Sequence, residues 1–189
     1  MTVTLPLVGE PLALDLVNTL ARGPEGDVDL LASAAEFRSW LEAQSGRLPT
    51  TPEAVEIDLP ALRALRTQVT EAVERVREGL PPLPAARAAL VEAQLAAPAH
   101  RSLDWDGAEL AARRVRTGGA TEVLLAELAE AAVELLSDPA SVQRIRRCEG
   151  PDCRLLFVAV NPRRRWCSAA ACGNRVRVAR YYQRHRGTV

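Results

Sequence analysis

Cys148-Glu-Gly-Pro-Asp-Cys153 and Cys167-Ser-Ala-Ala-Ala-Cys172 are the two segments that decide how the C-terminal part of this chain folds. They hold all four cysteines of the 189 residues, as two close pairs separated by 13 residues. Four thiolates at about 2.3 Å satisfy a tetrahedral zinc ion, and two short loops can bring such pairs to one point. The spacing therefore predicts one structural Zn²⁺ bound by Cys148, Cys153, Cys167 and Cys172. A pair of disulfides is disfavoured by a reducing compartment, and four unrelated buried thiols by the clustering.

The residues around the cysteines predict a small scaffold for the metal. We expect strands at 143–147 and 155–160, turns at Gly150-Pro151 and Asn161-Pro162, a return strand at 163–167 and a helix from Cys172 to about Arg186. Knuckle, hairpin and helix in this order describe a treble-clef-like zinc finger. Its expected core of Phe157, Val158, Trp166 and Val178 is too small to stay folded without metal.

The same cysteines argue against catalysis. A catalytic zinc needs an open coordination position and a nearby acid or base, whereas four thiolates close the coordination sphere. The only acids close by in sequence are Glu149 and Asp152, and the His-x-Glu and Pro-Cys-x-x-Cys signature of nucleobase deaminases is absent. We therefore expect that the protein is not an enzyme.

Residues 1–140 predict a mainly helical part. Apolar residues at steps of three and four indicate helices at about 61–78, 85–97 and 124–135, and Ser33-Ala-Ala-Glu36 fits a capping box before a shorter helix. Residues 100–117 alternate around Asp106-Gly107 and indicate a β-hairpin. The expected fold class is mainly α (α+β), with a helical N-terminal domain at 1–140 that carries a possible β-hairpin, and the small zinc finger at 141–189.

Charge is distributed unevenly along the chain. Residues 1–140 hold 12 Arg and 22 acidic residues, a net charge of −10, whereas residues 141–189 hold 12 Arg and 2 acidic residues, a net charge of +10. The chain has no Lys, so each of its side-chain cations other than histidine is a planar guanidinium that can make several hydrogen bonds. A basic end beside an acidic part is typical of a segment that binds nucleic acid or another polyanion.

The beginning of the chain does not have the pattern of a targeting signal. Met1–Glu10 lacks a basic n-region, and its apolar run is soon broken by acidic residues. We therefore expect no export signal and no membrane contact, and place the protein in the cytoplasm.

The segment Arg164-Arg-Trp-Cys-Ser-Ala-Ala-Ala-Cys-Gly-Asn-Arg175, with Tyr181-Tyr182 after it, resembles the CGNR zinc-finger family. Members of that family join this finger to an N-terminal helical domain called ABATE, and the opening of that domain is similar to Leu12-Ala-Leu-Asp-Leu-Val-Asn-Thr19. The resemblance implies a bacterial, stress-related transcriptional regulator whose four cysteines are zinc ligands.

Arginines of the finger are the predicted nucleic-acid contacts. On a helix beginning near Asn174, one stripe holds Arg177, Arg180 and Arg184 with Tyr181 at its edge, and the hairpin end adds Arg163, Arg164 and Arg165. Guanidinium groups bind phosphates and read guanine edges, and a tyrosine ring can stack on a base. Other residues are expected to support the finger: Gly173 by backbone freedom, Asn174 as a cap, Arg175 by offsetting the charge of the metal centre, and Trp166 and Phe157 by packing.

Asp15 and Asn18 are the polar residues that stand out in the N-terminal part. Helical spacing puts them on one face of an apolar segment. They form a candidate ligand pocket, and the alternative is capping or a buried hydrogen bond, which is the more common explanation for such a pair. Both explanations stay open at this point.

Together these features predict a bacterial stress-related transcriptional regulator that binds DNA through its basic finger, with RNA as the nearest variant. The alternative from another class is a zinc-finger module for protein interaction, whose basic finger docks on an acidic partner or on its own N-terminal domain. A finger this small reads only a few base pairs, so we expect sequence-specific binding to need a homodimer or a second contact surface. The sequence identifies neither a small-molecule effector nor a target site.

Overall fold

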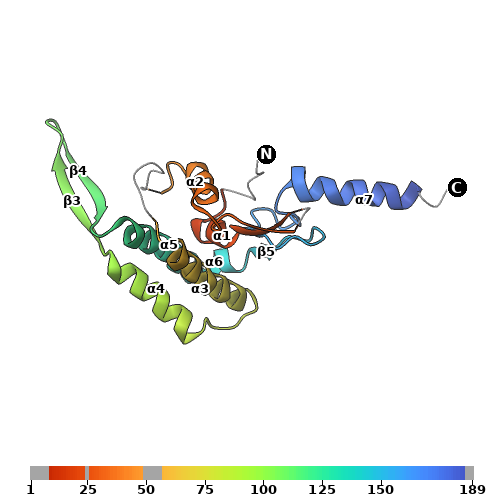
Figure 1. Cartoon of the computed structure of the whole chain (residues 1–189), viewed down its shortest axis with the longest axis horizontal. Helices are drawn as coiled ribbons and strands as arrows, with labels where there is room; N and C mark the ends of the chain where they lie inside the picture. Colours follow the sequence, from red (N-terminus) through yellow and green to blue (C-terminus); the bar gives the residue numbers. More distant parts are fainter. Residues whose placement is uncertain (1–8, 24–25, 49–56, 186–189) are drawn as a thin grey trace.

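In a computed structural model of the chain, the structure describes residues 9–23, 26–48 and 57–185. The molecule is elongated, with a β-hairpin projecting from one end of a helical body and helix α7 (Asn174–His185) from the other (Figure 1). The expectation of no export signal rests on Met1–Glu10, most of which lies outside the described residues. Among the helices that the structure describes, none combines the length and apolar character needed to cross a membrane.

Four helices of the described chain pack into the body: α1 (Leu12–Val17), α3 (Leu59–Arg77), α4 (Pro84–Ala96) and α5 (Ala120–Ser137). Helix α3 begins where the Asp58 carboxylate accepts a hydrogen bond from the Ala61 amide at 3.0 Å, and it ends before Gly79, whose φ of 77° is left-handed. The apolar stripes of these helices face one another in a single hydrophobic core. The three long helices predicted from periodicity are therefore confirmed.

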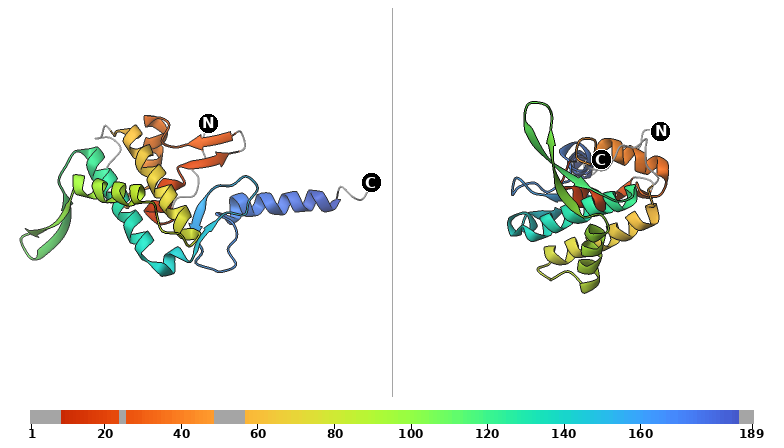
Figure 2. Two further views of the ribbon diagram at one scale, coloured as in Figure 1. Left: turned by 90° about the horizontal axis from the view of Figure 1, so that it is seen from below. Right: turned by 90° about the vertical axis from the view of Figure 1, so that its left-hand side faces the viewer.

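A shorter helix, α2 (Ala34–Ala43), covers one end of this core (Figure 2). Its predicted capping box is present, because the Glu36 amide donates to Ser33 Oγ at 3.3 Å and the Ser33 hydroxyl donates to the Glu36 carboxylate at 2.8 Å. The rings of Phe37 and Trp40 stack with their centroids 6.1 Å apart and are buried in the core.

The hairpin predicted at 100–117 is confirmed as β3 (Ala99–Trp105) and β4 (Leu110–Arg116), paired antiparallel. The Asp106 carboxylate closes the turn by accepting hydrogen bonds from two backbone amides, at 2.8 and 2.9 Å. An ion pair between Arg114 and Glu130 of α5 ties the base of the hairpin to the body. Beyond that base the hairpin stands clear of the helices (Figures 1 and 2).

Two of the three strands predicted in the C-terminal part, those at 143–147 and 155–160, are present and form a hairpin. Strand β5 (Ile145–Arg147) pairs antiparallel with β6 (Leu156–Val158), whereas residues 163–167 form no strand. The prediction of a return strand is wrong because the second edge of β6 is occupied by the side chains of Glu10 and Asn18. Two backbone amides of β6 donate to these side chains, at 2.8 and 2.9 Å.

The apolar residues predicted for the finger core separate into three groups. Phe157 and Trp166 lie in a small cluster with the cysteines, as expected. Val158 belongs to the core of the helical body instead. Val178 is 45% exposed, because it belongs to α7, which projects away from the body (Figure 1).

Helix α7 begins at Asn174, close to the predicted beginning. A π-helical turn, η1 (Ala169–Gly173), contains Cys172 and leads directly into α7. The end expected near Arg186 lies outside the described residues, which end at His185.

A further hairpin, β1 (Leu20–Gly23) with β2 (Gly26–Asp29), has no counterpart in the sequence analysis. Its Ala21 is buried in the cluster that contains the cysteines, and Asp27 forms an ion pair with Arg154 at 3.1 Å. A short helix, α6 (Pro139–Val142), then connects α5 to β5. The N-terminal part thus contributes directly to the packing around the finger.

Candidate metal centre and its surroundings

Four sulfur atoms converge between the β5–β6 loop and η1. The Sγ atoms of Cys148, Cys153, Cys167 and Cys172 all lie within 4.8 Å of one another, and the separation of Cys153 Sγ from Cys167 Sγ is 3.9 Å. A tetrahedron with metal–sulfur bonds of about 2.3 Å has edges of about 3.8 Å. None of the four cysteines is in a disulfide, and three of them are buried. The cluster therefore fits one structural Zn²⁺ with a closed coordination sphere.

The electrostatics of the cluster depend on Cys148. Its Sγ accepts hydrogen bonds from the backbone amides of Cys167 at 3.2 Å and Gly150 at 3.4 Å. The contact with the Cys153 thiol, followed by that with Cys167, lowers the pKa of Cys148 to about 2. This thiolate raises the pKa of Cys153 to about 12 and also raises the pKa of Cys167. Further thiolates therefore form readily only with a cation among the sulfurs, which is the charge that Zn²⁺ supplies.

The residues predicted to support the finger lie close to the cluster. Arg175 Nη2 donates to Cys172 Sγ at 3.7 Å, so a positive charge lies beside the ligands. The Gly173 amide donates to the Ser168 carbonyl at 2.9 Å within η1, and Asn174 is the first residue of α7. Gly173 does not have a positive φ, so backbone freedom is not what this position requires.

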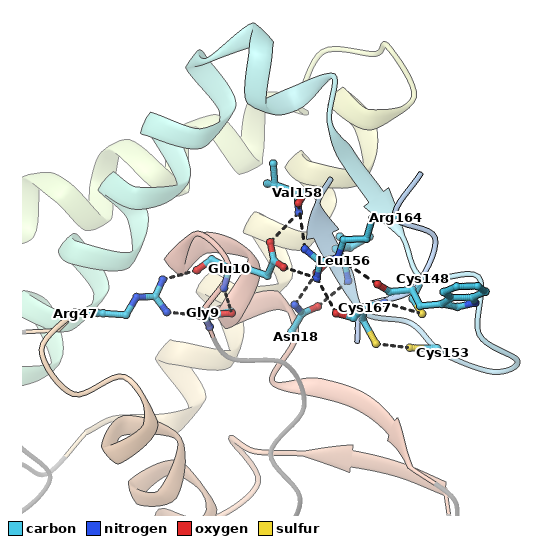
Figure 3. A network of polar contacts seen from close by, with 12 residues as sticks. Gly9, Glu10, Asn18, Arg47, Cys148, Cys153, Leu156, Val158, Arg164 and Cys167 are labelled. Carbon is cyan, nitrogen blue, oxygen red and sulfur yellow. Dashed lines mark hydrogen bonds and ion pairs between the residues drawn. The ribbon is translucent and has the colours of Figure 1, made fainter. Parts of the chain in front are cut away.

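Arg164 is half-buried, and its guanidinium is used for contacts within the protein. Its guanidinium lies 4.2 Å from the Phe157 ring centroid. It donates to the Cys167 carbonyl at 2.7 Å (Figure 3). It also donates to Glu10 Oε1 at 2.8 Å, while Glu10 Oε2 accepts from the Val158 amide at 2.8 Å. Because the guanidinium already has these partners, Arg164 has a structural role in place of the predicted phosphate contact.

Asp15 and Asn18 are both buried, and their polar atoms are used by the protein itself. The Asp15 carboxylate accepts hydrogen bonds from two backbone amides, at 2.9 and 3.2 Å, and from the side chains of Gln44 and Arg47. The Asn18 amide donates to the Leu156 carbonyl and accepts from the Leu156 amide, both at 2.9 Å (Figure 3). The explanation by buried hydrogen bonds therefore describes both residues.

Two of the arginines predicted at the hairpin end are on the surface. Arg163 is exposed and makes no ion pair among the described residues. Arg165 is exposed as well, but it donates to the Glu149 carboxylate at 2.6 Å. Of this pair, Arg163 is the one without a competing acidic partner.

The predicted stripe on α7 is described only in part. Arg177 is exposed and makes no ion pair within the described chain. The Tyr181 ring is also exposed and stacks on the His185 ring, with centroids 4.0 Å apart. Arg180 and Arg184 belong to the same helix by their backbone, and their side chains lie outside what the structure describes.

Two family models match the chain, and together they cover the body and the metal centre. Residues 144–185, which include all four cysteines, match the CGNR zinc finger. Residues 10–139 match ABATE, a family described as "Putative stress-induced transcription regulator". The chain belongs to the ABATE family. No curated protein matches this ABATE chain by sequence comparison.

Some residues that build this ABATE protein's metal site gave no signal in the sequence. Glu10 contacts β6 from 148 residues away, and Ala21, in a strand that was not predicted, lies in the buried cluster with the cysteines. Gly150 was assigned only to a turn, although a side chain there has no room. Its position between two ligand cysteines could have indicated this lack of room, because a loop that brings two ligands to one metal ion folds tightly.

Replacing Gly150 by alanine tests the close packing of the ligands. A Cβ at this position would lie 2.9 Å from both Cβ and Sγ of Cys172 and 3.4 Å from Cys148 Sγ. We expect Gly150→Ala to weaken zinc binding about 10- to 100-fold, as other changes next to metal ligands do, measured by competition with a chromogenic chelator. The control is Gly173→Ala, whose Cβ would meet no atom closer than 3.5 Å. Equal zinc affinities of the two variants would contradict the close packing of Gly150 against the ligand cysteines.

Replacing Asn18 by alanine tests the link between the body and the finger. The change leaves the buried amide and carbonyl of Leu156 without partners, and each such group costs about 1–3 kcal/mol. We expect the free energy of unfolding to fall by about 2–4 kcal/mol, measured by urea denaturation followed by tryptophan fluorescence. Asn161→Ala is the matched control, because that side chain is exposed. A cost no larger than that of the control would refute the link.

Proposed function

We propose that this ABATE protein is a transcriptional regulator whose zinc finger binds duplex DNA. The observation that carries the proposal is α7, a helix of 12 residues that projects from the body and exposes Arg177 and Tyr181 (Figure 1). An α-helix about 10–12 Å across fits the major groove of B-DNA, which is about 12 Å wide. The major groove of an RNA duplex is deep and narrow, which favours DNA as the target.

The zinc ion has a structural task in this proposal. It holds η1 against the β5–β6 loop and so sets the direction in which α7 leaves the body. Arg163, in the loop after β6, adds a further exposed guanidinium. Guanidinium groups from both positions would neutralise backbone phosphates, and this contribution is independent of base sequence.

The role that we propose is binding and not catalysis. Four thiolates leave zinc no open position for a substrate or an activated water. The family description supports a link to a stress response, and a regulator of bacterial genes would work in the cytoplasm, where the DNA is.

A second candidate function is docking of the basic finger on acidic protein surfaces. Three ion pairs favour it, since Arg147 pairs with Glu74, Arg154 with Asp27 and Arg164 with Glu10, all between the finger and the N-terminal part. These arginines face the body, whereas Arg163 and α7 do not take part in any ion pair within the described residues. The docking therefore neutralises one side of the finger and leaves the other side available to DNA.

The test is a fluorescence-anisotropy titration of zinc-loaded protein with duplex DNA, duplex RNA and single strands across salt concentrations. We expect salt-sensitive binding to duplex DNA. Changing Arg177, Arg180 and Arg184 together to alanine removes three phosphate contacts, so the slope of log K against log salt should become shallower by about 2.7. Zinc content should stay unchanged.

The control removes the same charge elsewhere. Arg22, Arg38 and Arg113 are exposed arginines of the N-terminal part, and changing these three to alanine should leave DNA affinity almost unaltered. Equal loss in both triple variants would mean that only net charge matters. Unchanged DNA binding by the α7 variant would refute the role of the helix.

A further inference from the structure

The β3–β4 hairpin carries an apolar face that nothing covers within the described chain. The register pairs Leu103 with Ala112 and Trp105 with Leu110, and side chains at alternate positions of a strand share a face. Leu103, Trp105 and Leu110 are 67%, 63% and 64% exposed. Exposed groups of large apolar side chains mark interaction sites, and an isolated two-stranded hairpin is only marginally stable in water.

The opposite face of the hairpin is suited to water. Asp104 accepts hydrogen bonds from Ser102 Oγ at 3.3 Å and from Arg113 Nε at 2.7 Å. Ala111, which pairs with Asp104, also lies on this polar face. The hairpin is therefore amphipathic, with one face suited to solvent and the other suited to a partner.

Helix α4 carries a second uncovered apolar surface. Ala86 and Leu90 are buried toward the body, whereas Ala88, Val91 and Leu95 recur at steps of three and four on the exposed side. Val91 is 53% and Leu95 is 70% exposed. The buried face of α4 already packs on α3 and α5. The exposed stripe therefore stabilises the helix only if a further surface covers it.

The hairpin cannot cover the α4 stripe of its own chain. Only Ala97 and Pro98 separate the end of α4 from the beginning of β3. The hairpin continues beyond the end of α4 and points away from the helix (Figure 1). A second copy of the chain carries the same two surfaces and can cover both.

We propose that two copies of this chain form a dimer by exchanging hairpins, so that the apolar face of each hairpin covers the exposed stripe of the partner's α4. The two surfaces match in length, because the 13 residues of α4 extend about 20 Å and the 7 residues of a hairpin strand about 23 Å. The exchange is two-fold symmetric and closed, so it stops at the dimer. It covers five large apolar side chains on each copy, on the scale of a standard interface of about 800 Å² per partner.

Charges at the edges of the two surfaces are complementary. The hairpin has Asp106 and Glu109 at its tip and Arg101 near its base, all exposed. On α4, Arg87 lies one turn before Val91 and Glu92 follows it, and neither makes an ion pair among the described residues. When the tip of a hairpin lies at the N-terminal end of the partner's α4, its acids meet Arg87 and its Arg101 lies toward Glu92.

The first experiment measures the mass of the zinc-loaded full chain by light scattering after size exclusion, over a dilution series. We expect a species of twice 20.5 kDa. Trp105→Glu on the hairpin and Leu95→Glu on α4 should each weaken the dimer about 30-fold or more, as loss of a central apolar contact does. Ala111→Glu, on the polar face, is the matched control and should remain dimeric. Zinc content and circular dichroism establish that each variant is folded, and Leu103→Glu replaces any hairpin variant that is not.

The second experiment mixes the two defective variants. In an exchanged dimer of Trp105→Glu with Leu95→Glu, one of the two contacts joins an unmodified hairpin to an unmodified α4, so mixing should restore heterodimers. A wild-type chain that stays monomeric would overturn the proposal. So would a dimer that survives both single changes, or a mixture in which no heterodimer forms.

Discussion

Strand β6 must have hydrogen-bond partners on both edges, and the arrangement of the whole molecule follows from how they are supplied. One edge pairs with β5, and the other receives the carboxylate of Glu10 and the amide of Asn18. Leaving such buried amides without partners would cost about 1–3 kcal/mol each. The strand is therefore held between β5 and the two residues that flank α1. The ligand loops are positioned from it, since Cys153 lies just before β6 and the chain returns to Cys167 after it.

The same arrangement sorts the arginines of the basic segment into two groups. Those that face the body, Arg147, Arg154 and Arg164, pair with acids of the N-terminal part. Those that face away, Arg163 and Arg177, make no ion pair within the described residues. The opposite net charges of the two parts are thus only partly neutralised within the chain. The arginines that pair with the N-terminal part are therefore not the ones to which we assign DNA contacts in the proposed function.

What could be predicted from the sequence depends on how local the cause is. The cysteine cluster, the long helices, the capping box at Ser33 and the β3–β4 hairpin depend on residues close together in the chain, and each was predicted. Strands β5 and β6 lie within the predicted strands, but the absence of a third strand was missed because its cause, Glu10 and Asn18 on the second edge of β6, lies 138 or more residues away. Val178 was misplaced for a related reason. Helical periodicity divides α7 into two faces, but it does not say whether anything covers them.

The shared packing has a thermodynamic consequence for the metal. Ile145, Leu156 and Val158 belong to the core of the helical body, while Phe157 between them belongs to the cluster around the cysteines. A tightly bound ion stabilises the folded state by its binding free energy, and here the folded state includes the body as well as the finger. Linkage makes this reciprocal, so a change in the body that destabilises the fold also weakens metal binding. The contact between the two parts runs from Glu10 to Arg164, which donates to the carbonyl of the ligand Cys167. Through Glu10 and Arg164, the N-terminal part therefore contacts the ligand segment at Cys167, which η1 and α7 follow.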